Sequence, residues 1–260
     1  MEVECMEQLE TMEWEKEGKV ARVIFNRPHL LNAMNNQATL DLNSVAEAIA
    51  KEESIRVVVI TGSGRSFCTG IDLKELSSDR IEMVYHHRFE RSLRIFETME
   101  KIIIAGIKGY CLGGGLQLAL ACDIRVAADN AILGLPAIKE CLIPGLSTYR
   151  LPRHIGLGRA KRMVLSGEHI NAQEAYAMGL LGYVLPLAEF EAQLEQVIEN
   201  YLRVCSVATL KSKTLCNLSF ELDYDRFLHK YFESQEIAQT SEDHFEARRA
   251  YRENRDPEFK

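Results

Sequence analysis

Short apolar runs with the character of β-strands alternate with helical patterns through the first half of the chain. The predicted strands cover residues 19–25, 56–61, 101–107 and 124–127. Residues 35–53 carry apolar side chains at helical spacing, and residues 78–99 are predicted to form a second helix. Because strands that alternate with helices usually pair in parallel, this order predicts an α/β fold with a parallel sheet.

The chain after Arg150 is predicted to be mainly helical. The helical segments cover residues 159–165, 171–178, 187–204, 208–218 and 224–253. Little sheet remains for these helices to cover, so we interpret them as a cap or an oligomer interface. We therefore expect a core of residues 1–200 that carries the site, followed by a helical region of residues 201–260 that contacts neighbouring subunits.

The composition of the 260-residue chain narrows the class of partner. Apolar residues make up 47% and charged residues 27%, which suits a globular protein with a sizeable core. The net charge of −7 argues against a nucleic acid or an anionic membrane as the main partner. Residues 1–17 lack the apolar segment of a secretory signal, and no apolar run reaches about 18 residues. A soluble cytoplasmic protein is therefore expected.

The seven cysteines are irregularly spaced and include no CxxC pair. We interpret them as reduced thiols, because cytoplasmic proteins usually keep cysteines reduced. For Cys68 and Cys111, small-residue packing is favoured over a nucleophilic role, since no histidine partner is evident from the sequence. Neither HExxH nor a paired Cys/His spacing occurs, so no metal site is expected.

Three loops rich in glycine and small residues stand out. They cover residues 67–73, 109–117 and 134–145. The triplet Gly113-Gly114-Gly115 precedes a predicted helix, where it could either allow close backbone packing or present N–H groups to an anion. Taken alone, this loop favours packing. It is neither a GxGxxG dinucleotide fingerprint nor a Walker A loop, because the required spacings are absent.

Taken together, the motifs resemble those of the crotonase (enoyl-CoA hydratase/isomerase) superfamily. Residues 26–35 resemble its NRP-x-x-x-NA-x-N opening, residues 66–73 its FxxGxDL loop, and residues 109–123 its glycine-triplet loop and helix. Residues 156–160, 172–180 and 257–259 also match, so the resemblance runs from about Trp14 to the end. It implies the ClpP/crotonase-like spiral of ββα units with a helical C-terminal region. It also implies trimers, often paired into hexamers.

The resemblance further implies that two backbone N–H groups, those of Ile71 and Gly114, form an oxyanion hole for a thioester carbonyl. Preorganised amides at a helix N-terminus stabilise the negative charge that develops on an enolate oxygen. The substrate handle is then CoA or the phosphopantetheine arm of an acyl carrier protein, with no separate cofactor. Arg27, Asp72, Leu73 and Lys74 match segments that contact CoA in relatives. For Arg27 and Lys74, a solvated surface charge is the alternative.

The chain departs from the family at the positions of its catalytic acids. Hydratases carry two glutamates at the positions of Gln117 and Ala137, and other branches carry an acid at the position of Gly145. Glutamine hydrogen-bonds but exchanges no proton near neutral pH. Addition of water needs a general base and a general acid. Ordinary hydratase activity by that route is therefore not expected.

Decarboxylation of a β-carboxyacyl thioester is favoured instead, because it needs an oxyanion hole and a proton donor but no carboxylate base. A carboxylate in the pocket would even repel the carboxylate of the substrate. Candidate proton donors are Tyr85, His86, His87 and Tyr149. For the histidine pair and Tyr149, a surface or packing role is the alternative.

Two further hypotheses stay open. A hydratase or isomerase could use a relocated acid, for which Glu140 and Glu75 are the candidates. Alternatively, the chain could bind an acyl thioester without catalysis, although its two intact oxyanion loops argue mildly against that hypothesis. The position of carboxylates relative to Ile71 and Gly114 discriminates among these possibilities.

Overall fold

The main sheet of the molecule has seven strands, and its centre is parallel as predicted. The computed structural model describes residues 3–259, with side chains from residue 9 onward. In spatial order the strands are β1 (Val3–Gln8), β2 (Met12–Glu17), β3 (Val20–Phe25), β4 (Val57–Gly62), β5 (Ile102–Ile107), β7 (Ile124–Ala128) and β10 (Tyr183–Leu185). The first three pair antiparallel, and every pairing from β3 to β10 is parallel. The sequence analysis did not predict β1, β2 or β10.

A second, smaller sheet carries part of the glycine-rich segment. It consists of β6 (Tyr110–Leu112), β8 (Ile132–Gly134) and β9 (His169–Asn171). β6 and β8 are parallel, whereas β8 and β9 are antiparallel. The sequence analysis interpreted the segment that contains β6 as a turn. Strands of three residues are too short to show a two-residue period, which explains the difference.

Eleven α-helices lie within the described residues. They are α1 (Asn36–Lys51), α2 (Leu73–Ser77), α3 (Met83–Thr98), α4 (Gly114–Ala121), α5 (Ser147–Ile155), α6 (Leu157–Ser166), α7 (Ala172–Ala177), α8 (Phe190–Val204), α9 (Val207–Leu218), α10 (Tyr224–Gln239) and α11 (Glu242–Glu253). Short 3-10 turns are η1 (Pro28–Leu30), η2 (Pro136–Glu140) and η3 (Leu187–Glu189). The segment predicted as one helix, residues 224–253, is two. Ser241 separates them because its side chain caps α11, accepting from the His244 amide at 3.2 Å.

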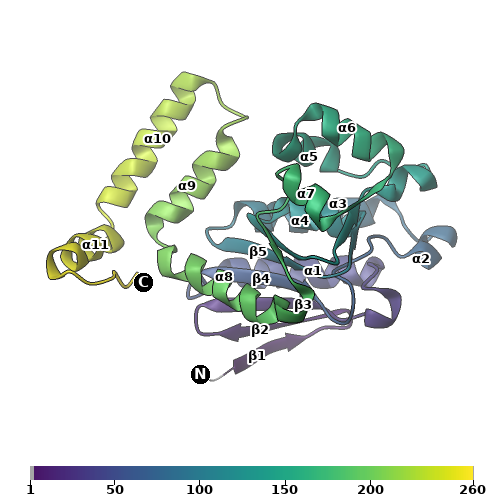
Figure 1. The fold of residues 1–260 in the computed structure, drawn as a ribbon, viewed down its shortest axis with the longest axis horizontal. Coiled ribbons are helices and arrows are strands. Elements are labelled where there is room, and N and C mark those ends of the chain that lie inside the picture. Colours follow the sequence, from purple (N-terminus) through teal and green to yellow (C-terminus); the bar gives the residue numbers. More distant parts are fainter. Residues whose placement is uncertain (1–2, 260) are drawn as a thin grey trace.

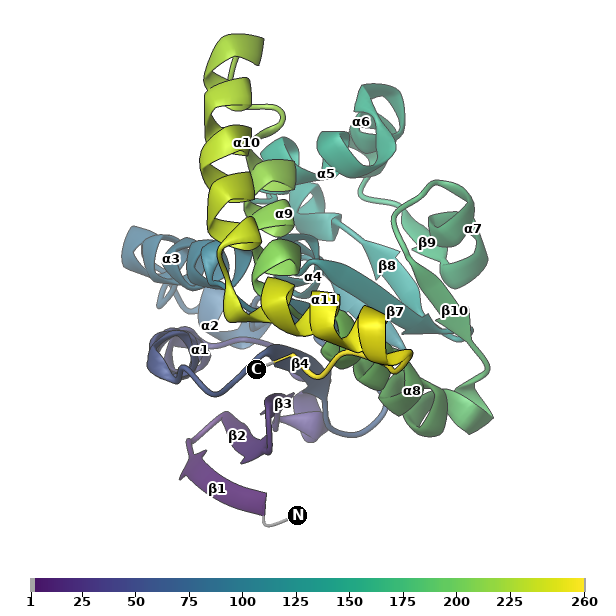
Figure 2. The ribbon, with the colours of Figure 1, turned by 90° about the vertical axis from the view of Figure 1, so that its left-hand side faces the viewer.

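Helices cover both faces of the main sheet (Figures 1 and 2). Side chains alternate along β4, so Val58 and Ile60 join the core cluster shared with α1 and α3. Val57 and Val59 join a second cluster, which includes the buried face of α8. Strands buried on both faces explain the continuous apolar runs that the sequence shows at β4 and β5.

The C-terminal helices stand apart from this core. α9 and α10 form a hairpin that extends away from the sheet, and α11 turns back toward it (Figure 1). The division predicted at residue 200 falls inside α8, whose apolar face packs on the core. Among residues 3–259, no helix combines the length and the apolar character that crossing a membrane requires.

Candidate functional site

A cavity of about 980 Å³ lies where the three glycine-bearing loops meet α3. Every residue that lines it lies between Leu30 and His169. Most of the residues singled out by the sequence analysis are among them: Ile71, Asp72, Leu73, Lys74, Tyr85, His86, His87, Gly114, Gln117, Ala137, Glu140 and Gly145. Arg27, Glu75 and Tyr149 do not line the cavity.

Backbone hydrogen bonds hold the loops against one another. The Cys68 amide donates to Tyr110 O at 3.0 Å, and the Leu112 amide donates to Cys68 O at 2.9 Å. This parallel bridge between Cys68 and Cys111 joins the first loop to β6. The Gly113 amide, donating to Gly134 O at 2.9 Å, ties in the third loop. The relative position of the loops is thus fixed largely by main-chain atoms.

The amides of Ile71 and Gly114 are both left free by this arrangement. The Met34 amide donates to Gly70 O at 2.7 Å and the Asp72 amide donates to Met34 O at 2.9 Å. Successive amides of an extended segment point to opposite sides, so the Ile71 amide points away from Met34. Gly114 is the first residue of α4, and its amide belongs to the unpaired first turn of that helix. Within the described residues neither amide has a hydrogen-bond acceptor.

Gly70 allows the two loops to approach closely. Its φ of 89° lies in the region that favours glycine, and a Cβ there would lie 2.8 Å from Gly114 N and 2.9 Å from Leu112 O. Arg125 anchors the other end of α4. Its buried guanidinium donates to Cys122 O at 2.8 Å and to Leu180 O at 2.7 Å. Gly70 thus lets the first loop pack on the N-terminus of α4, and Arg125 holds its C-terminal end. Both contacts fix the position of the helix beside the cavity.

Arg27 and Asp72 form an ion pair at the edge of the first loop. Nη2 of Arg27 lies 3.0 Å from Oδ2 of Asp72, and Nη1 donates to Ala33 O. Asp72 also caps α2, accepting from the Lys74 amide at 3.0 Å. Arg27 is thus engaged in joining the opening motif to this loop, whereas Lys74 is exposed and lines the cavity.

The three usual acid positions lie together at the cavity, and none carries an acid. Gln117, Ala137 and Gly145 all line it. A Cβ on Gly145 would overlap Oε1 of Gln117 and lie 3.0 Å from its Cδ. The carboxamide of Gln117 therefore packs on the backbone of Gly145, in the space that a side chain at position 145 would need.

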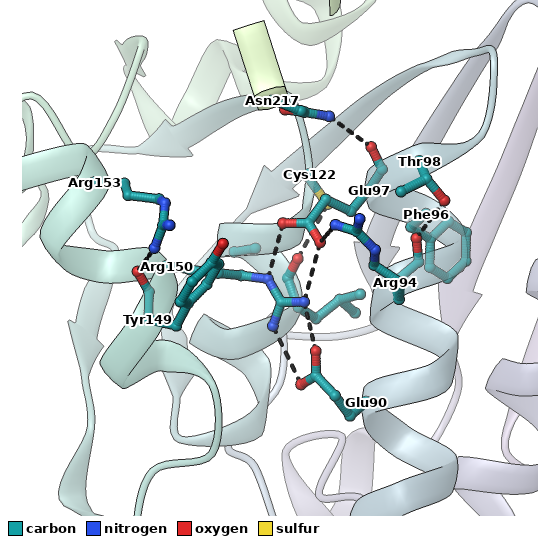
Figure 3. A network of polar contacts seen from close by, with 12 residues as sticks. Glu90, Arg94, Phe96, Glu97, Thr98, Cys122, Tyr149, Arg150, Arg153 and Asn217 are labelled. Carbon is teal, nitrogen blue, oxygen red and sulfur yellow. Dashed lines mark hydrogen bonds and ion pairs between the residues drawn. The ribbon is translucent and has the colours of Figure 1, made fainter. Parts of the chain in front are cut away.

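Three other carboxylates line the cavity, and arginines hold two of them. Asp72 pairs with Arg27, as described above. Glu90 accepts two hydrogen bonds from the guanidinium of Arg150, at 2.5 and 3.2 Å (Figure 3). Glu140 is exposed, and within the described part of the chain it has no basic partner. Glu140 is thus the carboxylate most available to a ligand.

Arg150 links α5 to α3 through two glutamates, as Figure 3 shows. Its side chain is 4% exposed and also contacts Glu97, with Nε 3.1 Å from Oε1. Burial alone would raise the pKa of Glu97. The hydrogen bonds and charges of Arg150 and Arg94 outweigh it and hold that pKa below its usual value. Of this ion-paired network, Glu90 and Arg94 line the cavity, and Arg150 and Glu97 lie behind them.

The candidate proton donors divide into two groups. Tyr85, His86 and His87 line the cavity from α3. Burial raises the pKa of Tyr85, whose hydroxyl already donates to Met34 O at 3.2 Å. Burial and the neighbouring His87 lower the pKa of His86, so its imidazole is neutral near pH 7.

Tyr149 and Glu75 are placed elsewhere, contrary to their proposed roles at the pocket. The Tyr149 hydroxyl donates to Glu221 at 2.9 Å, and Arg153 stacks on its ring. Glu75 accepts from the backbone and side-chain nitrogens of Asn36, at 2.8 and 3.1 Å, at the start of α1. A motif position gives the place of a residue along a loop but not the direction of its side chain, so the sequence did not show these contacts.

The six cysteines whose side chains are described are free thiols: Cys68, Cys111, Cys122, Cys141, Cys205 and Cys216. Cys5 lies outside the described side chains. Burial raises the pKa of Cys68 to about 12 and raises that of Cys111 as well. Both thiols stay protonated near neutral pH, which supports a packing role in the two loops.

The sequence analysis missed several residues of the cavity wall. On α3, His87 is followed by Glu90, Arg91 and Arg94 at helical spacing, so this polar stripe could have been found from the sequence. His169 had no such local signal. It reaches the cavity because β9 pairs with β8 and sets it opposite Gly134.

Comparison with known proteins gives the same family as the motifs. The sequence profile of the family described as enoyl-CoA hydratase/isomerase matches residues 15–260. This chain belongs to the enoyl-CoA hydratase/isomerase family. It also has the crotonase fold of that family, since the crystal structure of an enoyl-CoA hydratase from Bacillus anthracis superposes with a TM-score of 0.91. That structure is 32% identical, and the match covers 96% of this chain and 99% of the other.

Two relatives of this family member have named substrates. A crotonyl-CoA hydratase from Syntrophomonas wolfei is 32% identical over 251 residues, covering 94% of this chain and 96% of the relative. A 2,3-dehydroadipyl-CoA hydratase from Escherichia coli is 34% identical over 246 residues, with the same two coverages. Both relatives are therefore similar to this family member over nearly their whole length.

Proposed function

We propose that this chain is an enolate-forming enzyme for acyl-CoA thioesters, and that its reaction is decarboxylation of a β-carboxyacyl thioester. The observation that carries the proposal is the combination at one cavity of two free amides with glutamine, alanine and glycine at the acid positions. The names of the relatives support an acyl-CoA substrate. The phosphopantetheine arm of a carrier protein stays an alternative handle, and the proposed reaction needs no further cofactor.

The chemistry requires little more than this arrangement supplies. The thioester oxygen accepts from the amides of Ile71 and Gly114. The bond between the α-carbon and the carboxylate breaks, CO₂ leaves, and the electron pair of that bond forms the enolate. Fixed amide dipoles stabilise the charge on the enolate oxygen without rearranging. A proton then adds to the α-carbon.

Two of the three carboxylates that line the cavity have arginine partners, which suits an anionic substrate. An isolated carboxylate beside the substrate carboxylate would repel it. The partners of Asp72 and Glu90, Arg27 and Arg150, offset that charge. For the final protonation, His87 is the candidate donor on α3, since the His86 imidazole is neutral near pH 7 and the Tyr85 hydroxyl is already bound to Met34 O.

A hydratase that uses Glu140 is the second candidate. Two observations favour it: Glu140 lines the cavity without a basic partner, and the relatives are named hydratases. Glu140→Gln separates the candidates, with Glu75→Gln as a matched control outside the cavity. Loss of crotonyl-CoA hydration in the first variant alone would favour the hydratase. Retention of CO₂ release from malonyl-CoA or methylmalonyl-CoA in both variants would favour decarboxylation.

The amide pair is tested by Gly114→Pro against Gly114→Ala. Both variants add a Cβ that meets the flexible end of Met34, but only proline removes the N–H. Proline is tolerated at the first position of a helix. We expect Gly114→Pro to release CO₂ about 10²- to 10³-fold more slowly than Gly114→Ala. Equal rates would overturn the assignment, and CoA binding without turnover of any substrate would favour a non-catalytic binding protein.

A further inference from the structure

Gln117 lines the same cavity as Ile71 and Gly114, and its carboxamide has no part in the steps described above. Gln117 follows Gly114 by three residues on α4, so both lie on one side of the helix, about 4.5 Å apart along its axis. Each Cα–Cβ bond of a helix tilts toward the N-terminus, so the Gln117 side chain leans back toward the Gly114 amide. It therefore lies in the part of the cavity next to the Gly114 amide.

Gly145 determines where this carboxamide sits. A Cβ at position 145 would overlap Oε1 of Gln117 and lie 3.4 Å from its Nε2. Gly145 has a φ of 49°, and its amide donates to Ile143 O at 2.7 Å in a tight turn. The contact between Gln117 and this turn exists because position 145 carries no side chain.

The carboxamide also lacks a protein partner. Within residues 3–259, neither Oε1 nor Nε2 of Gln117 takes part in a hydrogen bond, and the nearby positions Ala137 and Gly145 supply no polar side chain. A carboxamide offers two N–H donors and one acceptor. A polar group of a bound ligand is thus the natural partner for it.

We propose that Gln117 recognises the carboxylate of a β-carboxyacyl thioester by donating from Nε2. The inference rests on the proposed function and assigns the residue that selects this substrate class. A glutamate at this position would repel a carboxylate, whereas a neutral amide attracts it. A neutral donor also binds a carboxylate less strongly than a guanidinium does, so less interaction is lost when CO₂ departs.

Equilibrium binding of two probes tests the inference without turnover. Sulfoacetyl-CoA carries an anion in place of the carboxylate and cannot release CO₂, while propionyl-CoA is similar in size and uncharged there. In Gln117→Leu we expect affinity for sulfoacetyl-CoA to fall about 10- to 100-fold, as hydrogen bonds to charged groups require, with propionyl-CoA changed less than about threefold. An equal change for both probes, or no change, would overturn the proposal.

Gly145→Ala supplies a second variant that leaves Gln117 chemically intact. Its Cβ would push the carboxamide aside, so the same selective loss is expected. Both changes disrupt the same contact, the one between the Gln117 carboxamide and the anion of the probe. Their effects in the double variant should therefore not add. Additive losses would contradict the coupling of Gln117 to Gly145, and retained melting temperatures exclude misfolding as the cause.

These binding experiments distinguish a failure of the Gln117 assignment from a failure of the proposed decarboxylation. A wild-type protein that binds sulfoacetyl-CoA through Gln117 but releases no CO₂ from malonyl-CoA would keep this assignment and overturn the reaction. Conversely, CO₂ release with unchanged binding in Gln117→Leu would keep the reaction and overturn the assignment.

Discussion

The core and the C-terminal helices of this chain bury their side chains to very different extents. In α4, seven of the eight residues are buried, and β5 is buried along its whole length. In α10, by contrast, Ser234 is the one buried residue among sixteen, while aromatic side chains such as Phe232 are exposed. No residue of α9, α10 or α11 lines the described cavity.

This difference in burial indicates that the core and the C-terminal helices have different roles. The core contains both the packing that stabilises the fold and the groups that form the site. The exposed aromatic residues of the C-terminal helices are costly to leave in water, so those helices are suited to pack on another surface.

The largest effect is expected at the site, which lies in the core. Hydration of crotonyl-CoA should be very slow in the wild type, because general acid and base groups each contribute about 10²- to 10⁴-fold. Gln117→Glu combined with Ala137→Glu should raise hydration, and either change alone should raise it less. Steady-state assays check this. Wild-type turnover of about 10 s⁻¹ or more would show that another group acts as the acid or base.

Stability should respond to core truncation far more than to truncation of α10. Phe96 is fully buried, so Phe96→Ala should lower the free energy of unfolding by about 3–5 kcal/mol. Phe232 is 59% exposed, so Phe232→Ala should change the free energy of unfolding of the isolated subunit by less than about 0.5 kcal/mol. Urea denaturation at low protein concentration measures both. Similar losses in the two variants would show that α10 belongs to the folding core.

Ion pairs of the core should likewise stabilise the fold more than ion pairs of the C-terminal helices. Arg150→Met leaves Glu90 without its arginine and Glu97 with Arg94 alone, and should cost about 3 kcal/mol near pH 7. Arg226→Met, which breaks the exposed pair with Asp223, should cost at most about 0.5 kcal/mol. Unfolding free energies of the wild type and both variants give this comparison.

The cost of Arg150→Met should also depend on pH. The folded-state pKa of Glu97 is lowered from 4.5, so its stabilising contribution is present above about pH 4.5 and is lost as the pH falls through the lower folded value. The difference between wild type and Arg150→Met should therefore shrink on acidification. A difference that is independent of pH would argue against the charge of Glu97 as the cause.

The smallest effect on folding, but a clear one on assembly, is expected from Phe232→Asp. We expect the wild type to form trimers or pairs of trimers through its C-terminal helices, and a charge on α10 to weaken them. Light scattering at micromolar concentration distinguishes these states. A monomeric wild type would contradict the assignment of these helices to subunit contacts.

The central strands and long helices could be predicted because their side chains repeat along the sequence. Residues 56–61 and 101–107 read as apolar runs, and they form the buried β4 and β5. The strands β6, β8, β9 and β10 have three residues each, too few to show a period. β1 and β2 were missed because glutamates interrupt them, although Met12 and Trp14 alternate into the core.

The candidate site was predicted to the level of its loops but not of its side-chain contacts. The positions of Ile71, Gly114 and Gln117 follow from motif order, and all three line one cavity. The pairing of Arg27 with Asp72 joins residues 45 positions apart, and no periodicity encodes it. The contact between Gln117 and Gly145 likewise depends on a turn whose geometry the sequence does not reveal.

The main-chain bridge between Cys68 and Cys111 has a consequence for protein engineering. Because backbone atoms connect the two loops and Gly70 lets them approach, the spacing of the Ile71 and Gly114 amides is set mainly by the main chain. A combinatorial library that varies positions 117, 137, 140 and 145 would leave those bonds untouched. The chain is therefore a suitable starting scaffold for selecting new thioester chemistries, with the amide pair as the constant part and the four side chains as the variable part.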